Sequence, residues 1–420
     1  MSELIRPPRG TFDILPDQAP MRRAVVETAR SILEGAGYRR IETPAFEVTE
    51  LFTRTVGEAT DIVQKEMYTF SDGKGRSLTL RPEVTAPVMR AYLDHGMHKL
   101  PQPVRLWYAS SCWRYERAQK GRYRQFWQVG AEAIGSDDPA VDAESIVLLA
   151  RILAELGVGG LELRIASLGD APARDEYREL LRAHLRANEA RLSEEVRSRI
   201  DANPMRAFDS DDPGTREVMA GAPLLADHLA AADAAHFAEV LGLLDAAGLA
   251  YTVDPTLVRG LDYYTRTVFE FSSSALGAQS GVGGGGRYDG LAEQIGGAPV
   301  PGMGWAAGIE RILLAAEERP EPEPVTTLYV ATADDSPESR RAAFALVSEA
   351  RRAGVTAQME LAGRSLKGQR KQSERLGARF TAVVEGDAIV LEDREDGESW
   401  TEESRSAAVA SVLRERGLGQ

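Results

Sequence analysis

Two short basic segments carry the side chains best suited to bind an anion. The first, WRYERAQKGRYRQ at residues 113–125, holds five arginines and lysines against one glutamate, and the second, RSLKGQRKQSER at residues 364–375, also holds five against one. Because the guanidinium of arginine binds phosphate in a bidentate way, each segment is a candidate contact for a polyanion. The net charge of −14 argues against non-specific coating of nucleic acid. Charge alone leaves open the alternative that each segment is a solvated face of a helix or loop.

Other residue types limit the chemistry further. The glycine cluster at 283–286 lacks the G-x-x-x-x-G-K-[ST] pattern, so it is not a P-loop. All five histidines lie outside the basic segments and the glycine cluster, which argues against general base catalysis by an imidazole. The single cysteine, Cys112, excludes an internal disulfide and a C-x-x-C zinc site, and the sequence shows no other cluster of metal ligands.

Four polar segments lie in strand-rich surroundings where packing alone would not require them. They are TLRPEVTAP, WRYERAQKGRYRQFWQVGAE, LVRGLDYYTRTVFEF, and GVGGGGRYDGL followed by GMGWAAGIERI. Together they resemble the class II aminoacyl-tRNA synthetases, and RGLDYYTRTVFEF narrows the resemblance to the histidyl-tRNA synthetase family. The resemblance runs over nearly all 420 residues. It implies ATP-dependent ligation of L-histidine to tRNA(His) through a histidyl-adenylate, with release of AMP and pyrophosphate and with Mg²⁺ bridging the ATP phosphates.

The resemblance assigns the catalytic work to two arginines, Arg114 and Arg259. When the amino-acid carboxylate attacks ATP, negative charge builds on the α-phosphate and must be met by positioned cations. Arg114 contacts the α-phosphate and the substrate carboxylate in this family, and Arg259 does work that a second metal ion performs in related enzymes. We therefore expect no metal site formed by the protein alone.

The resemblance also places the nucleotide and the tRNA. It implies that Glu116 lies near the adenine amino group, that Phe126 stacks on the base and that Arg311 packs over it. It places Gln119 at the end of the tRNA acceptor stem.

Histidine selectivity requires buried partners for two ring nitrogens and for the α-amino group. The residues that the resemblance places around the amino acid are Glu83, Val84, Thr85, Arg114, Gln128, Glu132, Arg259, Tyr263, Tyr264 and Tyr288. Glu83 and Thr85 hold the amino group. A glutamate such as Glu132 is more often part of a solvated strand face, and only its place in the motif suggests a site.

The elements that must position these residues can be predicted from periodicity. Apolar spacing predicts a helix over residues 21–34, followed by a strand over 38–47 in which Pro44 lacks a ladder donor. The segments MYTFSD, SLTLRP, VRLWYASSCWRY and QFWQVGAEAIG read as further strands of an antiparallel sheet. Strands return at LELRIASLG and at TRTVFEFSS; the glycine cluster and one long helix follow, and Gly302, Gly304 and Gly308 are expected on that helix.

Two further regions have their own composition. Of the 80 residues in 171–250, nineteen are alanine, which predicts a helical insertion into the sheet domain, and the family resemblance implies that it grips the tRNA acceptor arm. The Pro- and Glu-rich stretch 318–325 reads as a linker. Beyond it, strands and helices alternate as in a small α/β domain with a largely parallel sheet. The predicted fold is thus α+β: a class II catalytic domain at 1–320 and an anticodon-binding α/β domain at 325–420.

Several expectations and alternatives complete the prediction. The chain lacks a long apolar segment and a secretion signal, so we expect a cytoplasmic enzyme with no membrane contact. Its first helix and its Pro44 strand resemble a class II homodimer interface.

The alternative functions are a regulatory subunit of ATP phosphoribosyltransferase, a synthetase for threonine, proline or glycine, and a tRNA-binding sensor without catalysis. Trp127 and Ala118 stand where the family often has His and Pro, which puts local packing and tRNA reading in doubt.

Overall fold

A computed structural model describes residues 4–57, 60–117, 119, 121–257, 260–277, 280–316, 326–386 and 388–415. Contacts divide the chain into two compact units, Met1–Pro320 and Glu321–Gln420. The predicted linker at 318–325 lies outside the described residues, as does Arg259.

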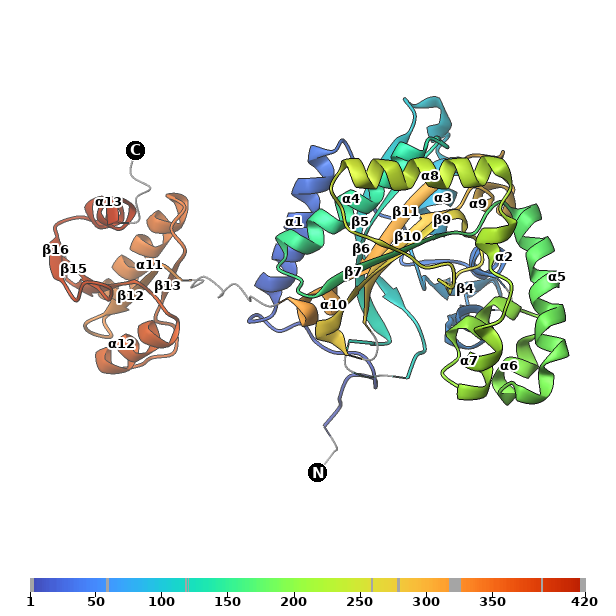
Figure 1. Cartoon of the computed structure of the whole chain (residues 1–420). Helices are drawn as coiled ribbons and strands as arrows, with labels where there is room; N and C mark the ends of the chain where they lie inside the picture. The colour runs from blue at the N-terminus through green and yellow to red at the C-terminus, as the bar shows by residue number, and fades with distance from the viewer. Residues whose placement is uncertain are drawn as a thin grey trace. The chain divides into compact units, whose positions relative to one another are not determined.

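An eight-stranded sheet forms the centre of the first unit, with the strand order β1-β5-β6-β11-β10-β9-β7-β8 (Figure 1). Its strands are β1 (Arg39–Arg40), β5 (Val104–Trp113), β6 (Gln125–Ile134), β7 (Leu161–Ser167), β8 (Thr252–Val253), β9 (Thr265–Ser273), β10 (Gly281–Arg287) and β11 (Gly302–Gly308). The two edge strands, β1 and β8, pair in parallel with β5 and β7, and all other neighbours are antiparallel. The prediction of an antiparallel catalytic sheet is confirmed.

A second, three-stranded sheet was not separated from the first by the sequence pattern. It has the order β2-β4-β3 and consists of β2 (Phe46–Val48), β3 (Tyr68–Ser71) and β4 (Ser77–Leu80). The strand expected over 38–47 is interrupted at Pro44, where a distortion or a sheet edge was expected, and Pro44 separates the edge strand β1 from β2. The buried Arg81 side chain donates to the carbonyl oxygens of Thr43 at 2.8 Å and Pro44 at 3.2 Å, which fixes the chain between the two sheets.

Helices cover one face of the large sheet and supply most of its core. They are α1 (Ala19–Gly35), α4 (Pro139–Glu155), α8 (Ala231–Ala246) and α10 (Ile309–Ala315). Their buried residues share one apolar cluster with the sheet, which includes Leu33, Leu149, Val240 and Phe269. The helix predicted over 21–34 is confirmed as α1. Smaller helices complete the unit: α2 (Thr49–Val56), η1 (Ile62–Glu66), α3 (Thr85–Asp94), η2 (Met97–Lys99), η6 (Ser274–Leu276) and α9 (Leu291–Gln294).

The region 171–250 is helical, as the alanine content indicated, but it is not one uniform piece. Its first part consists of α5 (Ala171–Ala187), η3 (Glu189–Arg191), α6 (Glu194–Arg199), η4 (Pro204–Asp209), α7 (Pro213–Met219) and η5 (Leu225–His228). These elements bury Leu181, Leu185 and Ile200 together. The remaining helix, α8, instead packs its buried Val240 and Leu244 into the core of the large sheet. We therefore use "insertion" for residues 171–228 alone.

The long helix expected after the glycine cluster is wrong. Residues 302–308 form the central strand β11, and the helix that follows, α10, has only seven residues. The reason is tertiary: a Cβ at Gly304 would lie 1.7 Å from Oε2 of Glu132 on β6, and one at Gly285 would lie 2.0 Å from the Gly304 carbonyl. These glycines permit β6, β10 and β11 to approach one another closely. Because glycine has a low strand propensity, the sequence pattern did not indicate a strand here.

The second unit is a five-stranded sheet with helices, in the order β13-β12-β14-β15-β16. Its elements are β12 (Leu328–Thr332), α11 (Pro337–Arg352), β13 (Ala357–Met359), α12 (Leu366–Arg375), β14 (Phe380–Glu385), β15 (Ala388–Asp393), β16 (Ser399–Glu402) and α13 (Arg405–Glu415). The first three strands of the sheet are parallel, while β15 and β16 are antiparallel. The α/β character is confirmed, whereas the sheet is mixed because β14 and β15 pair antiparallel and β16, which was not expected, adds a second antiparallel pair.

Candidate active site

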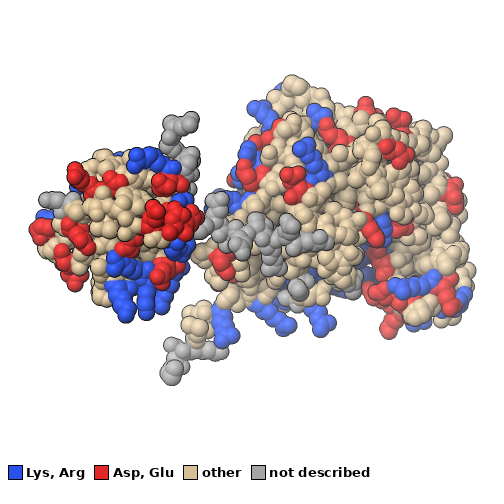
Figure 2. Space-filling view, turned by 60° about the vertical axis from the view of Figure 1, so that its left-hand side comes forward, with Lys and Arg blue, Asp and Glu red and all other residues tan. Residues whose placement is uncertain are grey.

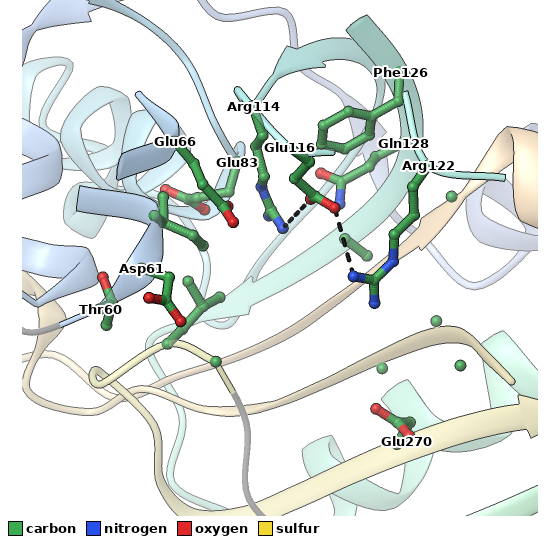
Figure 3. Close-up of a pocket in the computed structure, with 18 of the residues that line it drawn as sticks. Thr60, Asp61, Glu66, Glu83, Arg114, Glu116, Arg122, Phe126, Gln128 and Glu270 are labelled. Atoms are coloured by element: carbon green, nitrogen blue, oxygen red, sulfur yellow. Dashed lines mark ion pairs between the residues drawn. The ribbon is translucent and has the colours of Figure 1, made fainter. Parts of the chain in front are cut away.

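A cavity of about 780 Å³ opens in the first unit where the large sheet, the start of α3 and the insertion meet. Strands β5 and β6 supply one wall, the segment 260–264 and strands β9 and β10 supply another, and residues 60–62 border the opening. Figure 3 shows charged side chains from these separate elements pointing into one space. The long hairpin of β5 and β6 and the glycine-rich strands thus bring distant parts of the sequence together.

Arg114 projects from the end of β5 into the cavity. Its Nε donates to the Pro82 carbonyl at 2.9 Å, and its guanidinium carbon lies 5.4 Å from the centre of the Phe126 ring. Nη1 lies 3.9 Å from Oε1 of Glu116, a distance at which the charge is only partly compensated. The guanidinium is therefore held in place while one side of it faces the cavity.

Glu116 lies between two arginines, as Figure 3 shows. In addition to Arg114, Arg122 approaches its Oε2 to 3.5 Å. Beside them, Phe126 offers an aromatic face at the cavity wall. An aromatic ring next to a carboxylate acceptor and two cations is suited to a nucleotide, whose base is flat and whose phosphates are anionic.

Arg311, on α10, completes the opposite side of this region. Its Nε donates to the Gly281 carbonyl, and its Nη1 would lie 3.6 Å from a Cβ at Gly121. Burial, followed by the nearby Arg122, lowers the pKa of Arg311 from its ordinary value. An anion bound here would relieve the repulsion between the two guanidinium groups.

Glu83 lies just before α3, whose N-cap is Val84, and is almost fully buried. Its carboxylate accepts from the backbone N–H groups of Thr85 at 2.6 Å and Ala86 at 3.1 Å. Burial raises the pKa of Glu83 to about 7, although these N–H groups and Arg114 favour the charged form. A buried carboxylate with such a pKa gains from a cationic ligand such as an ammonium group.

The family resemblance implies that Glu83 holds the amino group of histidine, and the pH dependence of that binding provides a test. Between pH 4.5 and about 7 the folded chain keeps a proton on Glu83 that the unfolded chain has released, so this group makes stability fall as pH rises. A bound ammonium favours the carboxylate, so we expect the KM for histidine to fall over the same interval. Glu83→Gln should lose this dependence, apart from the titration of the ligand's own imidazole, which both proteins share. An identical pH profile in both, measured by pyrophosphate exchange, would exclude the role.

Glu132 lies one layer behind the cavity, fully buried. It accepts hydrogen bonds from Tyr288 Oη at 2.7 Å, Thr85 Oγ1 at 2.7 Å and Tyr108 Oη at 3.2 Å. Burial raises the pKa of Glu132 to about 8. The network connects α3, the hairpin of β5 and β6, and the end of β10, so Glu132 positions Thr85 at the cavity wall.

The structure places the expected site residues in three groups. Those that line the cavity are Glu83, Val84, Thr85, Arg114, Glu116, Phe126, Gln128, Tyr263, Tyr264 and Arg311. Glu132 and Tyr288 lie behind it, with the rings of Tyr263 and Tyr288 6.0 Å apart. Gln119 is exposed and pairs with Arg122 through backbone hydrogen bonds of 3.1 and 2.9 Å.

Sequence reasoning missed several polar residues of the cavity. They include Thr60, Asp61, Glu66, Tyr108, Arg164, Arg199, Asn203, Arg206, Asp262 and Glu270. Most lie in helical or irregular segments whose charge reads as an ordinary solvated surface. The alternation of TRTVFEF did separate Glu270 from its buried neighbours, and this was the one available signal.

Trp127, one of the departures from the family pattern, does not line the cavity, and the other that was named, Ala118, lies outside the described residues. Its ring faces the guanidinium of Arg22 at 4.7 Å and the Phe12 ring at 6.1 Å. Its backbone N–H donates to Glu310 at 3.1 Å. The substitution therefore affects packing between the N-terminal segment and β6.

Comparison with known proteins agrees with this geometry. The family model described as histidyl-tRNA synthetase matches residues 10–312. The chain belongs to the histidyl-tRNA synthetase family. It is 48% identical over 399 residues to the histidine–tRNA ligase of Streptomyces coelicolor, which covers 93% of each chain. It is 47% identical to that of Thermosynechococcus vestitus, over 90% of this chain and 89% of the relative.

A solved structure of this family confirms the fold. The apo histidyl-tRNA synthetase of S. aureus matches 97% of this chain and 100% of its own at 37% identity, with a TM-score of 0.81. The family resemblance inferred from RGLDYYTRTVFEF is thereby confirmed, together with the class II fold. Among the described residues, no helix is long and apolar enough to span a membrane, and no group of three or more His, Cys, Asp or Glu residues could hold a metal ion.

Proposed function

We propose that this member of the histidyl-tRNA synthetase family activates L-histidine with ATP and transfers it to tRNA(His). One observation carries the proposal. A buried carboxylate, Glu83, and a held guanidinium, Arg114, face the same cavity in which Phe126 and Arg311 supply nucleotide contacts. An amino acid bound by its ammonium at Glu83 would present its carboxylate towards Arg114 and the α-phosphate, which is the alignment that adenylate formation requires.

The side chains then divide the work. Arg114 and Arg259 meet the charge that develops on the α-phosphate, Phe126 and Arg311 hold adenine, and Glu116 accepts from its amino group. Gln128, Tyr263 and Tyr264 surround the histidine side chain, and Glu132 acts through Thr85. Mg²⁺ would accompany ATP and would supply further positive charge at its phosphates. The chain itself contributes positioning and electrostatic stabilisation.

Arg259 is tested by its replacement with histidine. We expect Arg259→His to lower the rate of histidine activation about a hundredfold or more, by analogy with the loss of one oxyanion donor. The KM for ATP and the melting temperature should change little. Pyrophosphate exchange and thermal unfolding measure these effects, and a variant that activates histidine at the normal rate would refute the role.

The tRNA contacts form a second part of the proposal. Gln119 reaches the acceptor stem from the exposed loop after Arg117, and the insertion grips the acceptor arm. In the second unit, α12 exposes Lys367, Arg370, Lys371 and Arg375. Figure 2 shows basic side chains gathered on the side of this unit where α12 lies. We assign this unit to the anticodon loop, whose phosphates such a cluster attracts.

We also propose a cytoplasmic homodimer. The three-stranded sheet exposes Phe46, Val48 and Phe70 by 49%, 50% and 43%, and the two phenylalanine rings lie 6.0 Å apart. An exposed apolar patch of this kind favours association with a second copy. Sedimentation at micromolar concentration should give the dimer mass, and a monomer would contradict the proposal.

The function is tested by exchange of labelled pyrophosphate into ATP. Exchange is expected with histidine and not with threonine, proline or glycine. Charging of tRNA(His) in a second assay then tests transfer. Failure to form an adenylate with histidine would favour the alternatives, a regulatory subunit or a sensor, both of which the full-length ligase relatives support less well.

A further inference from the structure

Contacts at three residues that line the cavity, Asp61, Asp262 and Tyr264, tie the insertion to the cavity wall. Arg199 and Arg206 contact Asp61, Asn203 contacts Asp262, and Arg174 donates to the Tyr264 carbonyl. Neither the sequence motifs nor the roles assigned above use the first two contacts. These two contacts can affect the cavity, because Asp61 and Asp262 both line it.

The interaction at Asp61 is the stronger of the two, because it consists of ion pairs with two arginines. Nη2 of Arg199 lies 3.0 Å from Oδ1 of Asp61, and Nη1 lies 3.5 Å from Oδ2. Nη2 of Arg206 reaches the same Oδ2 at 3.5 Å. All three side chains are about one-third exposed, at 33%, 30% and 31%, so the charges are partly shielded from water. The segment that contains Thr60 and Ile62, which also line the cavity, is thereby held against the insertion.

The contact at Asp262 acts on the segment 260–264, which adjoins the segment of Asp61 through Val56 and Gly57. Asn203 Nδ2 donates to Oδ1 of Asp262 at 3.4 Å, while the Asp262 backbone N–H donates to the Val56 carbonyl at 3.3 Å. The carboxylate also lies against Gly57, where a Cβ would come within 2.5 Å of Oδ2. Because Asp262 directly precedes Tyr263, the insertion fixes the positions of Tyr263 and Tyr264 through Asp262.

We infer that Arg199, Asn203 and Arg206 are positioning residues for histidine binding, which hold Asp61 and Asp262 and so fix the position of the cavity wall that these two adjoining segments form. This inference rests on the proposed function. It gives the insertion a role in amino-acid activation before any tRNA is bound. The nucleotide end, at Phe126 and Arg311, lies on different elements and does not depend on these contacts.

The test compares histidine and ATP in pyrophosphate exchange without tRNA. The double variant Arg199→Gln with Arg206→Gln should raise the KM for histidine about tenfold, since it leaves the half-buried Asp61 with only Lys65, whose Nζ lies 3.9 Å from Oδ1. The KM for ATP should stay unchanged. Adding Asp61→Asn to the double variant should have little further effect, because the two changes remove the same interaction. Arg191→Gln is the matched control, an exposed insertion arginine that pairs with Glu217 at 2.7 Å.

Salt provides a readout that a purely structural role would not change. In the wild-type chain the KM for histidine should rise with ionic strength, and the rise should be smaller in the double variant, which keeps only the charge contacts at Glu83 and Arg114. Equal changes in both KM values, together with a lower melting temperature, would overturn the inference. So would normal exchange with a loss confined to tRNA charging. If the wild-type chain shows no exchange with histidine at all, the proposed function itself fails.

Discussion

Replacing Arg114 by glutamine should lower the rate of histidine-dependent pyrophosphate exchange about a thousandfold, the upper range for loss of one positioned charge. The guanidinium is held by the Pro82 carbonyl at 2.9 Å and lies over the Phe126 ring, so its position is fixed before ATP binds. Glutamine retains a donor but neither the charge nor the bidentate fork.

The control for Arg114 lies on the same strand. Arg105 pairs with Glu144 at 3.3 Å and does not line the cavity. Arg105→Gln should leave exchange within about twofold of wild type, since partly exposed pairs contribute little. If both variants lose activity equally, the effect comes from the hairpin and not from a phosphate contact.

Gly304→Ala should destabilise the first unit by about 3 kcal/mol and abolish measurable histidine binding. The added Cβ would lie 1.7 Å from Oε2 and 2.6 Å from Cδ of Glu132, and 2.8 Å from the Ala131 carbonyl. Glu132 cannot move away, because Tyr288 and Thr85 both donate to it at 2.7 Å. Any relaxation must shift Thr85 or separate the two central strands.

A glycine-to-alanine substitution in α8 is the control, because it distinguishes the clash at Gly304 from the general effect of replacing a glycine. Gly242 lies in α8, and a Cβ there would meet nothing within 4 Å. Gly242→Ala should stabilise the chain by about 0.5–1 kcal/mol through helix propensity. Thermal unfolding and histidine titration of both variants provide the comparison, and a Gly304→Ala protein with normal melting and binding would show that β11 tolerates the side chain.

The sequence predicted the elements whose apolar spacing decides their structure, and missed those decided by neighbours. α1 and the strands β5 and β6 were predicted because their periodicity is strong. β11 was read as a helix because GMGWAAG contains no β-branched residue, and only the approach of Glu132 explains its glycines. Propensity is a weak prior wherever tertiary contacts select the residue.

The candidate site divides in the same way. Motif resemblance identified residues that line the cavity. It did not distinguish them from Glu132, which lies behind the lining residue Thr85. It also gave no indication of Asp61, whose arginine partners follow more than a hundred residues later in the insertion. Ion pairs between residues this far apart leave no local pattern in the sequence, so only the three-dimensional structure reveals them.

The strand order of the large sheet bears on how the chain is made. β10 and β11 occupy the middle of that sheet, yet they are its last strands to leave the ribosome. Until they emerge, the hairpin of β5 and β6 and the pair of β7 and β9 each expose an unpaired edge for the time needed to synthesise the rest of the unit. Exposed edges favour pairing with other chains. Nascent chains stalled before Gly302 should therefore bind chaperones or aggregate, whereas those that extend past Ala315 can close the sheet in a single step.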